Sequence, residues 1–211
     1  LRHVIFGEDP SWWVVVGDNG KIYTYANGIL TGRSSGVREN LYGVDAQGSD
    51  LVAVGGNGRV VYSDDGGLTW SSSSAGNLNL YDVDFVNTER VIAVGGSGTI
   101  VESNNSGETW SVQTGVPVSS ALYDVNHFTD YGNEAYAAVG DGYQLYSASG
   151  SSGSWSIAAM DDEVELRAVR YTFDYSSWFA AGEDGRVYYC DTVLPTSWTM
   201  TAPCSDETYY G

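Results

Sequence analysis

A chain of 211 residues with a formal net charge of −18 repels the phosphates of nucleic acids and the headgroups of anionic membranes, so we expect neither as a partner. No run of about 18 apolar residues occurs, and we therefore expect no insertion into a membrane. The chain has one lysine, Lys21, and is rich in Ser, Thr, Asn, Gly and Tyr. This composition is typical of secreted, envelope and virion proteins and favours an extracellular or surface-exposed setting.

One apolar motif recurs five times, at separations of 39 to 44 residues. Leu and Val keep fixed places in every copy, which predicts one strand per copy. The copies are LRHVIF (1–6), LYGVDA (41–46), LYDVDF (80–85), LYDVNH (122–127) and LRAVRY (166–171).

Each copy is followed by further short strands. A second apolar run ends in a glycine turn, as in VAVGGNG (52–58) and IAVGGSG (92–98), and the chain then resumes as RVVYS or TIVES. Glycine, Asn and Ser tolerate the positive φ that such turns require. A strand that bears a tryptophan (Trp70, Trp110, Trp155 or Trp198) closes most units, so we predict four strands and no helix in each unit.

Four-stranded units of about 40 residues are the blades of propellers. We predict an all-β fold, a β-propeller of four-stranded antiparallel blades that forms a single domain over 1–211. We favour a closed ring of five blades. The alternative is five blades of a larger ring, because residues 209–211 fall where a further repeat would begin. The expected blades are about 1–40, 41–79, 80–121, 122–165 and 166–208.

Two turns repeat the same side chains at the same spacing, in YSDDGGLTW (62–70) and ESNNSGETW (102–110). They resemble the Asp-box (BNR) motif of sialidase-type and other propellers. The surrounding pattern is most similar to the photosystem II assembly/stability factor type, and this resemblance implies a protein-assembly role. The first turn matches the motif at Ser63, Asp65, Gly67, Thr69 and Trp70; the second matches at Ser103, Gly107, Thr109 and Trp110, with Asn105 in place of the Asp.

The chemistry of this motif indicates a structural turn. A short Asp or Asn side chain accepts hydrogen bonds from turn N–H groups that have no strand partner. Asn105 stands where Asp65 stands in the preceding unit, so the position needs an acceptor and not a charge. We therefore interpret these carboxylates as part of the scaffold and expect Trp70 and Trp110 to be mostly buried.

A second group of carboxylates occupies the third and fifth positions of the five copies. Side chains at these positions share one side of a strand, and first strands of blades line the central channel. We expect these carboxylates to accept hydrogen bonds from neighbouring blades and water; the alternative is that they bind a hard cation such as calcium. The group comprises Asp45, Asp82, Asp84 and Asp124. We expect no cofactor. We also expect His3 and His127 to be ordinary strand residues.

The two cysteines, Cys190 and Cys204, flank a turn and a strand. We favour a disulfide that closes a loop of about 15 residues, which would add roughly 3 kcal/mol to stability. Two unpaired thiols are the alternative.

Three functions remain open from the sequence. We favour a non-catalytic binding or assembly scaffold that uses its faces to contact a protein or a surface glycan, with assembly into a larger complex. The first alternative is a structural or adhesion domain of a virion, filament or cell envelope. The second is a sialidase-like hydrolase, which would need an arginine cluster and a Tyr–Glu pair. The Arg-Ile-Pro signature of sialidases is absent, so we expect no enzyme.

Overall fold

The computed structural model describes residues 1–6, 12–130, 132–160, 164–173 and 176–201. These residues form five antiparallel sheets of four strands each and no α-helix, and each sheet keeps its strands in chain order. The predicted all-β propeller with five blades is confirmed. The described part of the chain contains no helix that could span a membrane.

The strands of the first three blades share one plan, with a short 3-10 turn between the second and third strands. Blade 1 contains β1 (His3–Phe6), β2 (Trp12–Val16), η1 (Asp18–Gly20), β3 (Lys21–Ala26) and β4 (Ile29–Ser34). Blade 2 contains β5 (Leu41–Gln47), β6 (Asp50–Gly55), η2 (Gly56–Gly58), β7 (Arg59–Ser63) and β8 (Ser71–Ser74). Blade 3 contains β9 (Leu80–Phe85), β10 (Val91–Gly95), η3 (Gly96–Gly98), β11 (Ile100–Ser103) and β12 (Ser111–Val112).

The last two blades have the same four strands; blade 4 has the longest first strand and, among the described residues, no 3-10 turn after its second strand. Blade 4 contains β13 (Leu122–Asp130), β14 (Asn133–Gly140), β15 (Gln144–Ser147) and β16 (Ser156–Ile157). Blade 5 contains β17 (Leu166–Thr172), β18 (Ser177–Gly182), η4 (Glu183–Gly185), β19 (Val187–Cys190) and β20 (Thr199–Met200).

The hydrophobic core lies between the blades. Strand β6 shows why: Leu51 and Ala53 face blade 1, whereas Val52 and Val54 face blade 3, and all four are fully buried. A strand that is buried on both faces reads as a continuous apolar run and not as an alternating one. Four such clusters join the five blades in succession, so each blade depends on its neighbours for a core.

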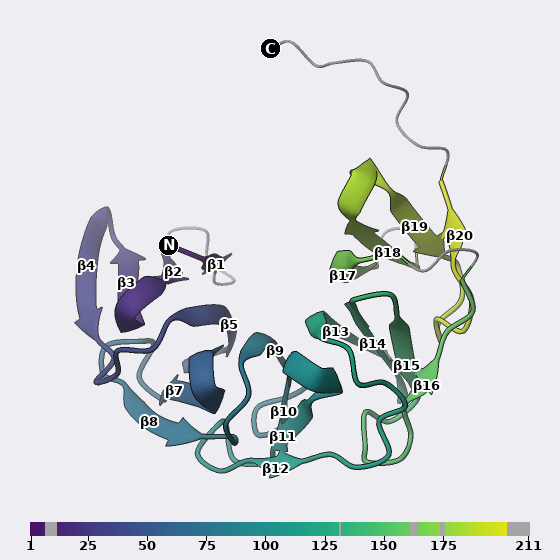
Figure 1. The fold of residues 1–211 in the computed structure, drawn as a ribbon. Helices are drawn as coiled ribbons and strands as arrows, with labels where there is room; N and C mark the ends of the chain where they lie inside the picture. The colour runs from purple at the N-terminus through teal and green to yellow at the C-terminus, as the bar shows by residue number, and fades with distance from the viewer. Residues whose placement is uncertain (7–11, 131, 161–163, 174–175, 202–211) are drawn as a thin grey trace.

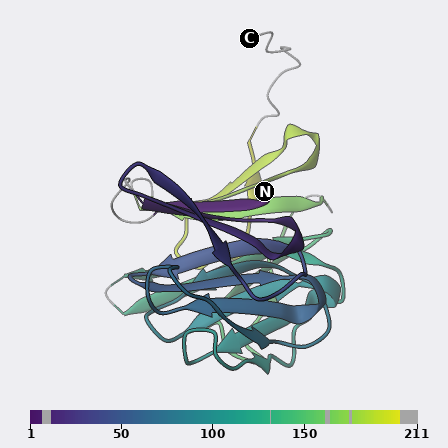
Figure 2. The ribbon, with the colours of Figure 1, turned by 90° about the vertical axis from the view of Figure 1, so that its left-hand side faces the viewer.

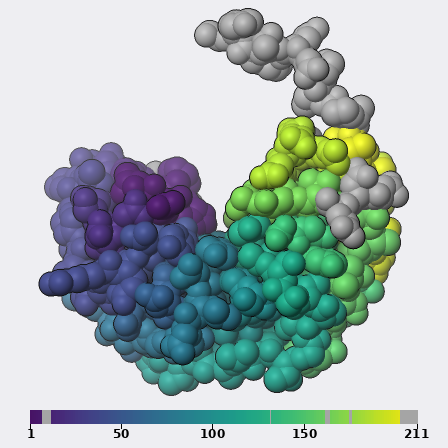
Figure 3. Space-filling view, viewed as in Figure 1, coloured from purple at the N-terminus to yellow at the C-terminus, as the bar shows by residue number. Residues whose placement is uncertain are grey.

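The blades follow one another around an arc, with blades 1 and 5 at its ends (Figure 1). Seen from the side, the sheets lie at the same level along the central axis around which the blades are arranged, so the arc is planar (Figure 2). An opening separates the two end blades in the space-filling view (Figure 3). The closed five-blade ring that we favoured is thus not formed, because the rotation from each blade to the next is too small for five to complete a turn.

The open arc leaves one apolar face of blade 1 in solvent. Leu1 is 76% exposed and Phe6 is 68% exposed, whereas Leu80 and Phe85, which hold the same positions in blade 3, are 1% and 3% exposed. In blade 3 these positions pack against the preceding blade. Blade 1 therefore presents to solvent the surface that blade 3 buries.

Candidate functional site

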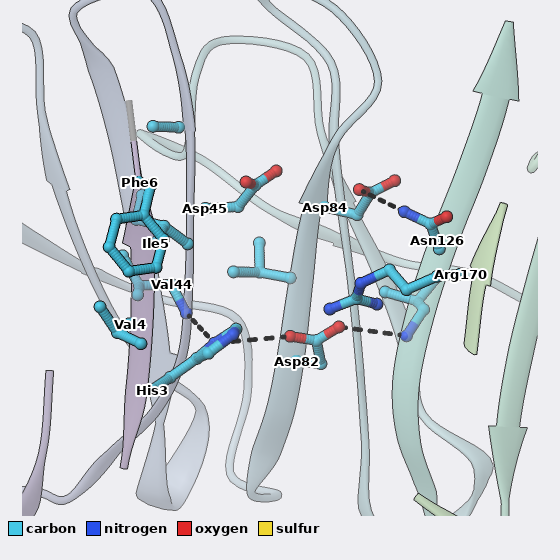
Figure 4. A pocket seen from close by; sticks show the side chains of 13 residues that line it. His3, Val4, Ile5, Phe6, Val44, Asp45, Asp82, Asp84, Asn126 and Arg170 are labelled. Carbon is cyan, nitrogen blue, oxygen red and sulfur yellow. Dashed lines mark hydrogen bonds and ion pairs between the residues drawn. The ribbon is translucent and has the colours of Figure 1, made fainter. Parts of the chain in front are cut away.

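A cavity of about 360 Å³ lies on the inner side of the arc, and residues from the third and fifth positions of the repeated motif line much of it (Figure 4). Strands β1, β5, β9, β13 and β17 contribute to its wall. Its polar lining comprises His3, Asp45, Asp82, Asp84, Asn126 and Arg170. Asp124 lies behind Arg170, is 5% exposed, and completes the set of four carboxylates that the sequence singled out.

The buried carboxylates connect each blade to the next. First strands of adjacent blades converge at the axis without forming a ladder, so some of their N–H groups need other acceptors. Asp82 accepts the N–H of Val125 at 3.1 Å, and Asp124 accepts the N–H of Val169 at 2.7 Å. These bonds join blade 3 to blade 4 and blade 4 to blade 5.

The same connection is made by residues of other types. Asp45 accepts the N–H of Phe85 at 2.7 Å, and Asn126, at the same position two blades later, accepts the N–H of Tyr171 at 2.9 Å. In blade 1, His3 Nδ1 accepts the N–H of Val44 at 3.1 Å, as its Asp equivalents do in later blades. Asp, Asn and His can all accept a hydrogen bond but otherwise differ in charge and size. These positions therefore require a hydrogen-bond acceptor and not a particular residue type.

Burial perturbs the acidic groups strongly. Burial, followed by the charge of Asp84, raises the pKa of Asp45 to about 7. Burial and the nearby Asp124 raise the pKa of Asp82 well above its usual value. Burial also raises the pKa of Asp84, although the hydrogen bond with His127 opposes it. These shifts follow from removing carboxylates from water close to one another.

The basic groups near the axis each lie beside a carboxylate. His127 Nδ1 is 2.5 Å from Asp84 Oδ2, and Arg170 Nη1 contacts both oxygens of Asp124 at 2.9 and 3.0 Å. Burial lowers the pKa of His127, but the hydrogen bond with Asp84 and its charge outweigh this effect and raise it. For His3, burial and the Arg170 charge lower the pKa.

This geometry does not resemble a sialidase site. Arg170 is the one arginine among the described residues that line the cavity, whereas that chemistry needs a cluster of arginines. In the same described ranges, no three Asp, Glu, His or Cys side chains are arranged to hold a metal ion. The calcium alternative for Asp45, Asp82, Asp84 and Asp124 therefore stays a prediction without a geometric basis.

The two Asp-box-like turns have the geometry of a structural motif. Asp65 accepts bonds from the Ser63 hydroxyl at 2.8 Å, the Thr69 hydroxyl at 2.6 Å and the Thr69 N–H at 2.9 Å. The Ser63 hydroxyl in turn accepts the N–H of Gly67 at 2.9 Å. The carboxylate bonds, those with Thr69 first, lower the pKa of Asp65 to about 2.

In blade 3 the amide of Asn105 takes over this role. Its Oδ1 accepts the Thr109 N–H at 2.9 Å, and its Nδ2 donates to the Thr109 hydroxyl at 2.9 Å. Trp70 and Trp110 are partly buried against the inter-blade cores, and each donates its indole N–H to the carbonyl of the motif glycine. The exposed parts of the two rings reduce the packing energy that full burial would have given.

The cysteine prediction reaches beyond the described residues. Cys190 is buried, forms no disulfide with any described residue, and lies 3.1 Å from the Thr192 hydroxyl. Cys204 lies outside the described residues, so the pairing stays a prediction.

A second surface, which our reading of the sequence did not single out, lies at the start of the first strands. In blade 2, Leu41 pairs with Gly55 and Gly43 pairs with Val54, so Tyr42 between them is a β-bulge. The same register shift occurs at the second position of blades 3, 4 and 5. A bulge turns a side chain out of the alternating pattern, and here it occurs at one position of four blades.

The bulged residues form a continuous row along one face of the arc. Tyr42 and Tyr81 have ring centroids 5.8 Å apart, and Tyr81 and Tyr123 have centroids 5.5 Å apart. Arg2 lies 5.8 Å from the centre of the Tyr42 ring, and Arg167 lies 4.1 Å from that of Tyr123. We call this row, Arg2, Tyr42, Tyr81, Tyr123 and Arg167, the tyrosine rim.

Glycine makes each bulge sterically accessible. A Cβ on Gly95 would lie 2.0 Å from the carbonyl oxygen of Asn79, and the matching glycines of blades 2, 4 and 5 would meet the equivalent carbonyl at the same distance. The first strand therefore crosses its neighbour at a point where no side chain fits. The glycine turn, which we used only as a strand marker, is the sequence signal that accompanies the bulge.

The rim is polar and partly open to solvent. The three tyrosines are partly buried, and none of their hydroxyls has a hydrogen-bond partner among the described residues. A shallow depression of about 440 Å³ beside Tyr42 is lined by Arg38, Glu39, Asn40, Asn57 and Asn79. This face thus combines aromatic area with unused hydrogen-bonding groups, as protein-binding surfaces do.

No protein-family model and no curated protein sequence matches the chain. Solved structures do. YCF48 bound to D1 peptide has a TM-score of 0.71 at 16% identity, with 96% of this chain and 66% of that chain covered. YCF48 from Cyanidioschyzon merolae has a TM-score of 0.70 at 16% identity, with 95% and 71% covered.

A third similar structure is the Cps50 (Swd1) β-propeller domain of Myceliophteria thermophila. Its TM-score is 0.69 at 9% identity, with 94% of this chain and 70% of that chain covered. At these identities the likeness shows the propeller fold alone. The chain spans about two thirds of the length of the structures that it resembles.

Proposed function

We propose that the protein is a non-catalytic, protein-binding propeller scaffold whose contact surface is the tyrosine rim. The observation that carries this proposal is the repeated bulge, which places Tyr42, Tyr81, Tyr123 and Arg167 side by side on one face. Arg2, at the start of blade 1, extends the row beside Tyr42. Tyr and Arg are enriched at the energetic centres of protein interfaces. The axial carboxylates, in contrast, are occupied in joining the blades.

The structural neighbours support this assignment. One of them is YCF48 bound to a D1 peptide, so a propeller of this shape can present a peptide-binding surface. The two Asp-box-like turns support membership of the Asp-box propellers, and with it the assembly role of the photosystem II factor type. The acidic, lysine-poor composition supports an extracellular or surface-exposed setting.

The proposal is tested by comparative capture of partners from an extract of the source organism. Three forms are immobilised: the wild type, the Tyr42→Ala/Tyr81→Ala/Tyr123→Ala variant, and the Leu68→Ala control. Leu68 is 57% exposed and lies in the turn between β7 and β8, at the other end of β7 from η2 and hence on the opposite face. Unfolding midpoints establish that all three forms are folded.

We expect the wild type and the Leu68 control to retain the same proteins and the rim variant to retain at least about 10-fold less, because interface centres carry most of the binding energy. Single Tyr81→Ala substitution serves if the triple variant is unstable. Equal retention by all three forms would reject the rim as the contact surface.

A further inference from the structure

We infer that the tyrosine rim is a seat for arginine side chains of a cationic partner segment. The inference rests on the proposed function and specifies the chemistry of the partner. Its support is that two guanidinium groups of this chain already lie against tyrosine rings of the rim.

Both ends of the row show an arginine placed over a tyrosine ring. The guanidinium carbon of Arg167 lies 4.1 Å from the centre of Tyr123, and that of Arg2 lies 5.8 Å from the centre of Tyr42. A guanidinium is planar and weakly hydrated, so it stacks on an aromatic face more readily than a lysine ammonium does. The rim therefore displays the contact that a partner arginine would make.

The middle of the row has no arginine of its own. Tyr81 meets Tyr42 and Tyr123 at interplanar angles of 41° and 49°, so the three rings are tilted and do not cover one another face to face. Tyr81 is partly buried, and no arginine in the described residues lies over it. A partner guanidinium can thus add to the row at its centre.

The charges around the rim favour a cation. Arg2 is paired with Asp18 at 2.8 Å, Arg59 with Glu39 at 3.2 Å, and Arg167 with Glu165, so these bases offer little to an anionic partner. Arg38, which lines the depression beside Tyr42, is the exception and has no ion pair among the described residues. With a net charge of −18, the chain as a whole attracts basic segments and repels acidic ones.

The test is isothermal titration calorimetry of the 211-residue chain with three peptides of equal length, alternating Gly-Arg, alternating Gly-Lys and alternating Gly-Glu. We expect the Gly-Arg peptide to bind about 5-fold or more tightly than the Gly-Lys peptide, since both have the same charge and only arginine stacks well. No binding is expected for the Gly-Glu peptide. The Arg-to-Lys preference should persist when salt is raised, although both affinities fall.

Variants locate the contact. Tyr81→Ala should reduce the affinity for the Gly-Arg peptide about 5-fold and abolish the preference over Gly-Lys, whereas Tyr81→Phe, which keeps the ring, should retain it. Leu68→Ala on the opposite face should bind as the wild type does. Equal binding of the Arg and Lys peptides, or a preference that survives Tyr81→Ala, would overturn the inference.

This experiment can fail independently of the proposed function. If the rim variant loses its captured partners but the wild type shows no preference for Gly-Arg, the rim is a contact surface with a different specificity. If neither result depends on the rim, both proposals fall.

Discussion

At the residue scale, the Asp-box-like turns and the axial strands use their recurring polar side chains in the same way. Asp65 and Asn105 perform the same task in equivalent turns, and Asp45 and Asn126 perform the same task at equivalent axial positions. In each pair an acceptor oxygen satisfies a backbone N–H that the sheet leaves unpaired. The protein therefore uses Asp mainly as a hydrogen-bond acceptor, and where the Asp is buried its charge has a cost.

The cost makes stability depend on pH. The pKa of Asp45 is 3.8 in an unfolded chain and about 7 in the fold, so the folded state binds a proton that the unfolded state releases. The stabilisation is present below pH 3.8 and is lost as the pH rises through 7. The raised pKa values of Asp82, Asp84 and His127 act in the same direction.

We predict that Asp45→Asn stabilises the protein at pH 8 by about 2–4 kcal/mol, because the amide keeps the bond to Phe85 N–H without a partly buried charge. Urea unfolding of both forms from pH 5 to pH 8 provides the measurement. The wild type should lose stability across this range, and the variant should lose less. A parallel pH dependence of the two forms would show that the pKa of Asp45 is not raised in the folded protein.

The exposed turn gives the opposite expectation. The pKa of Asp65 is lowered to about 2, so its contribution is present above 3.8 and is lost as the pH falls through 2. Asp65→Asn should leave the unfolding midpoint at pH 7 within about 2 °C, whereas Asp65→Ala should lower it by about 4 °C. Differential scanning calorimetry distinguishes them. An Asn variant as unstable as the Ala variant would mean that the turn requires the charge.

At the element scale, the repeated bulge connects a steric requirement to the surface that we propose as functional. The carbonyl of residue 79 approaches Gly95 so closely that a side chain is excluded, and this approach accompanies the shift that turns Tyr81 outward. The glycine and the tyrosine belong to different strands but to one structural device. A change at the glycine should therefore disturb the rim as well as the fold.

We predict that Gly95→Ala costs about 3 kcal/mol or more, because its Cβ would lie 2.0 Å from the Asn79 carbonyl oxygen. The adjacent Gly96→Ala is the matched control: its Cβ would lie 3.8 Å from the Asn79 carbonyl oxygen, and its cost should stay within about 0.5 kcal/mol. Denaturant titrations compare the two. Similar costs at both positions would contradict the close crossing.

The sequence allowed the blades to be predicted but not the rim. Leu and Val at fixed places with glycine turns indicated strands of a propeller, and the third and fifth positions of the first strands do face the axial cavity. The alternation rule would have put Tyr42 on the same side as Val44, facing the preceding blade, because a bulge is not visible in a periodic pattern. The backbone N–H groups that donate to the axial carboxylates could not be predicted either, because each lies in the next blade, about 40 residues further along the chain.

At the scale of the whole molecule, the arc ends at blade 1 in an exposed apolar face. The equivalent face of blade 3 is buried against the preceding blade. Leu1, Val4 and Phe6 occupy positions that are buried against the preceding blade in blade 3. Whether a ring closes depends on the rotation between blades, which no single repeat encodes. For this reason five units could be counted from the sequence while closure could not be derived from it.

We predict that Phe85→Ala lowers the free energy of unfolding by about 3–5 kcal/mol and that Phe6→Ala lowers it by less than about 1 kcal/mol. The two phenylalanines hold the same repeat position, but Phe85 is 3% exposed and Phe6 is 68% exposed. Equal losses in chemical denaturation would mean that Phe6 is buried in solution and that the arc is closed or covered.

The central claim, that the bulged rim is the surface through which this scaffold binds protein, is tested most directly by site-specific photo-cross-linking. A photoreactive phenylalanine replaces Tyr81 in one sample and Leu68, on the opposite face, in another. After irradiation in an extract of the source organism, the account predicts discrete protein adducts from position 81 and none from position 68. Adducts from position 68 alone, or the same adducts from both positions, would contradict it.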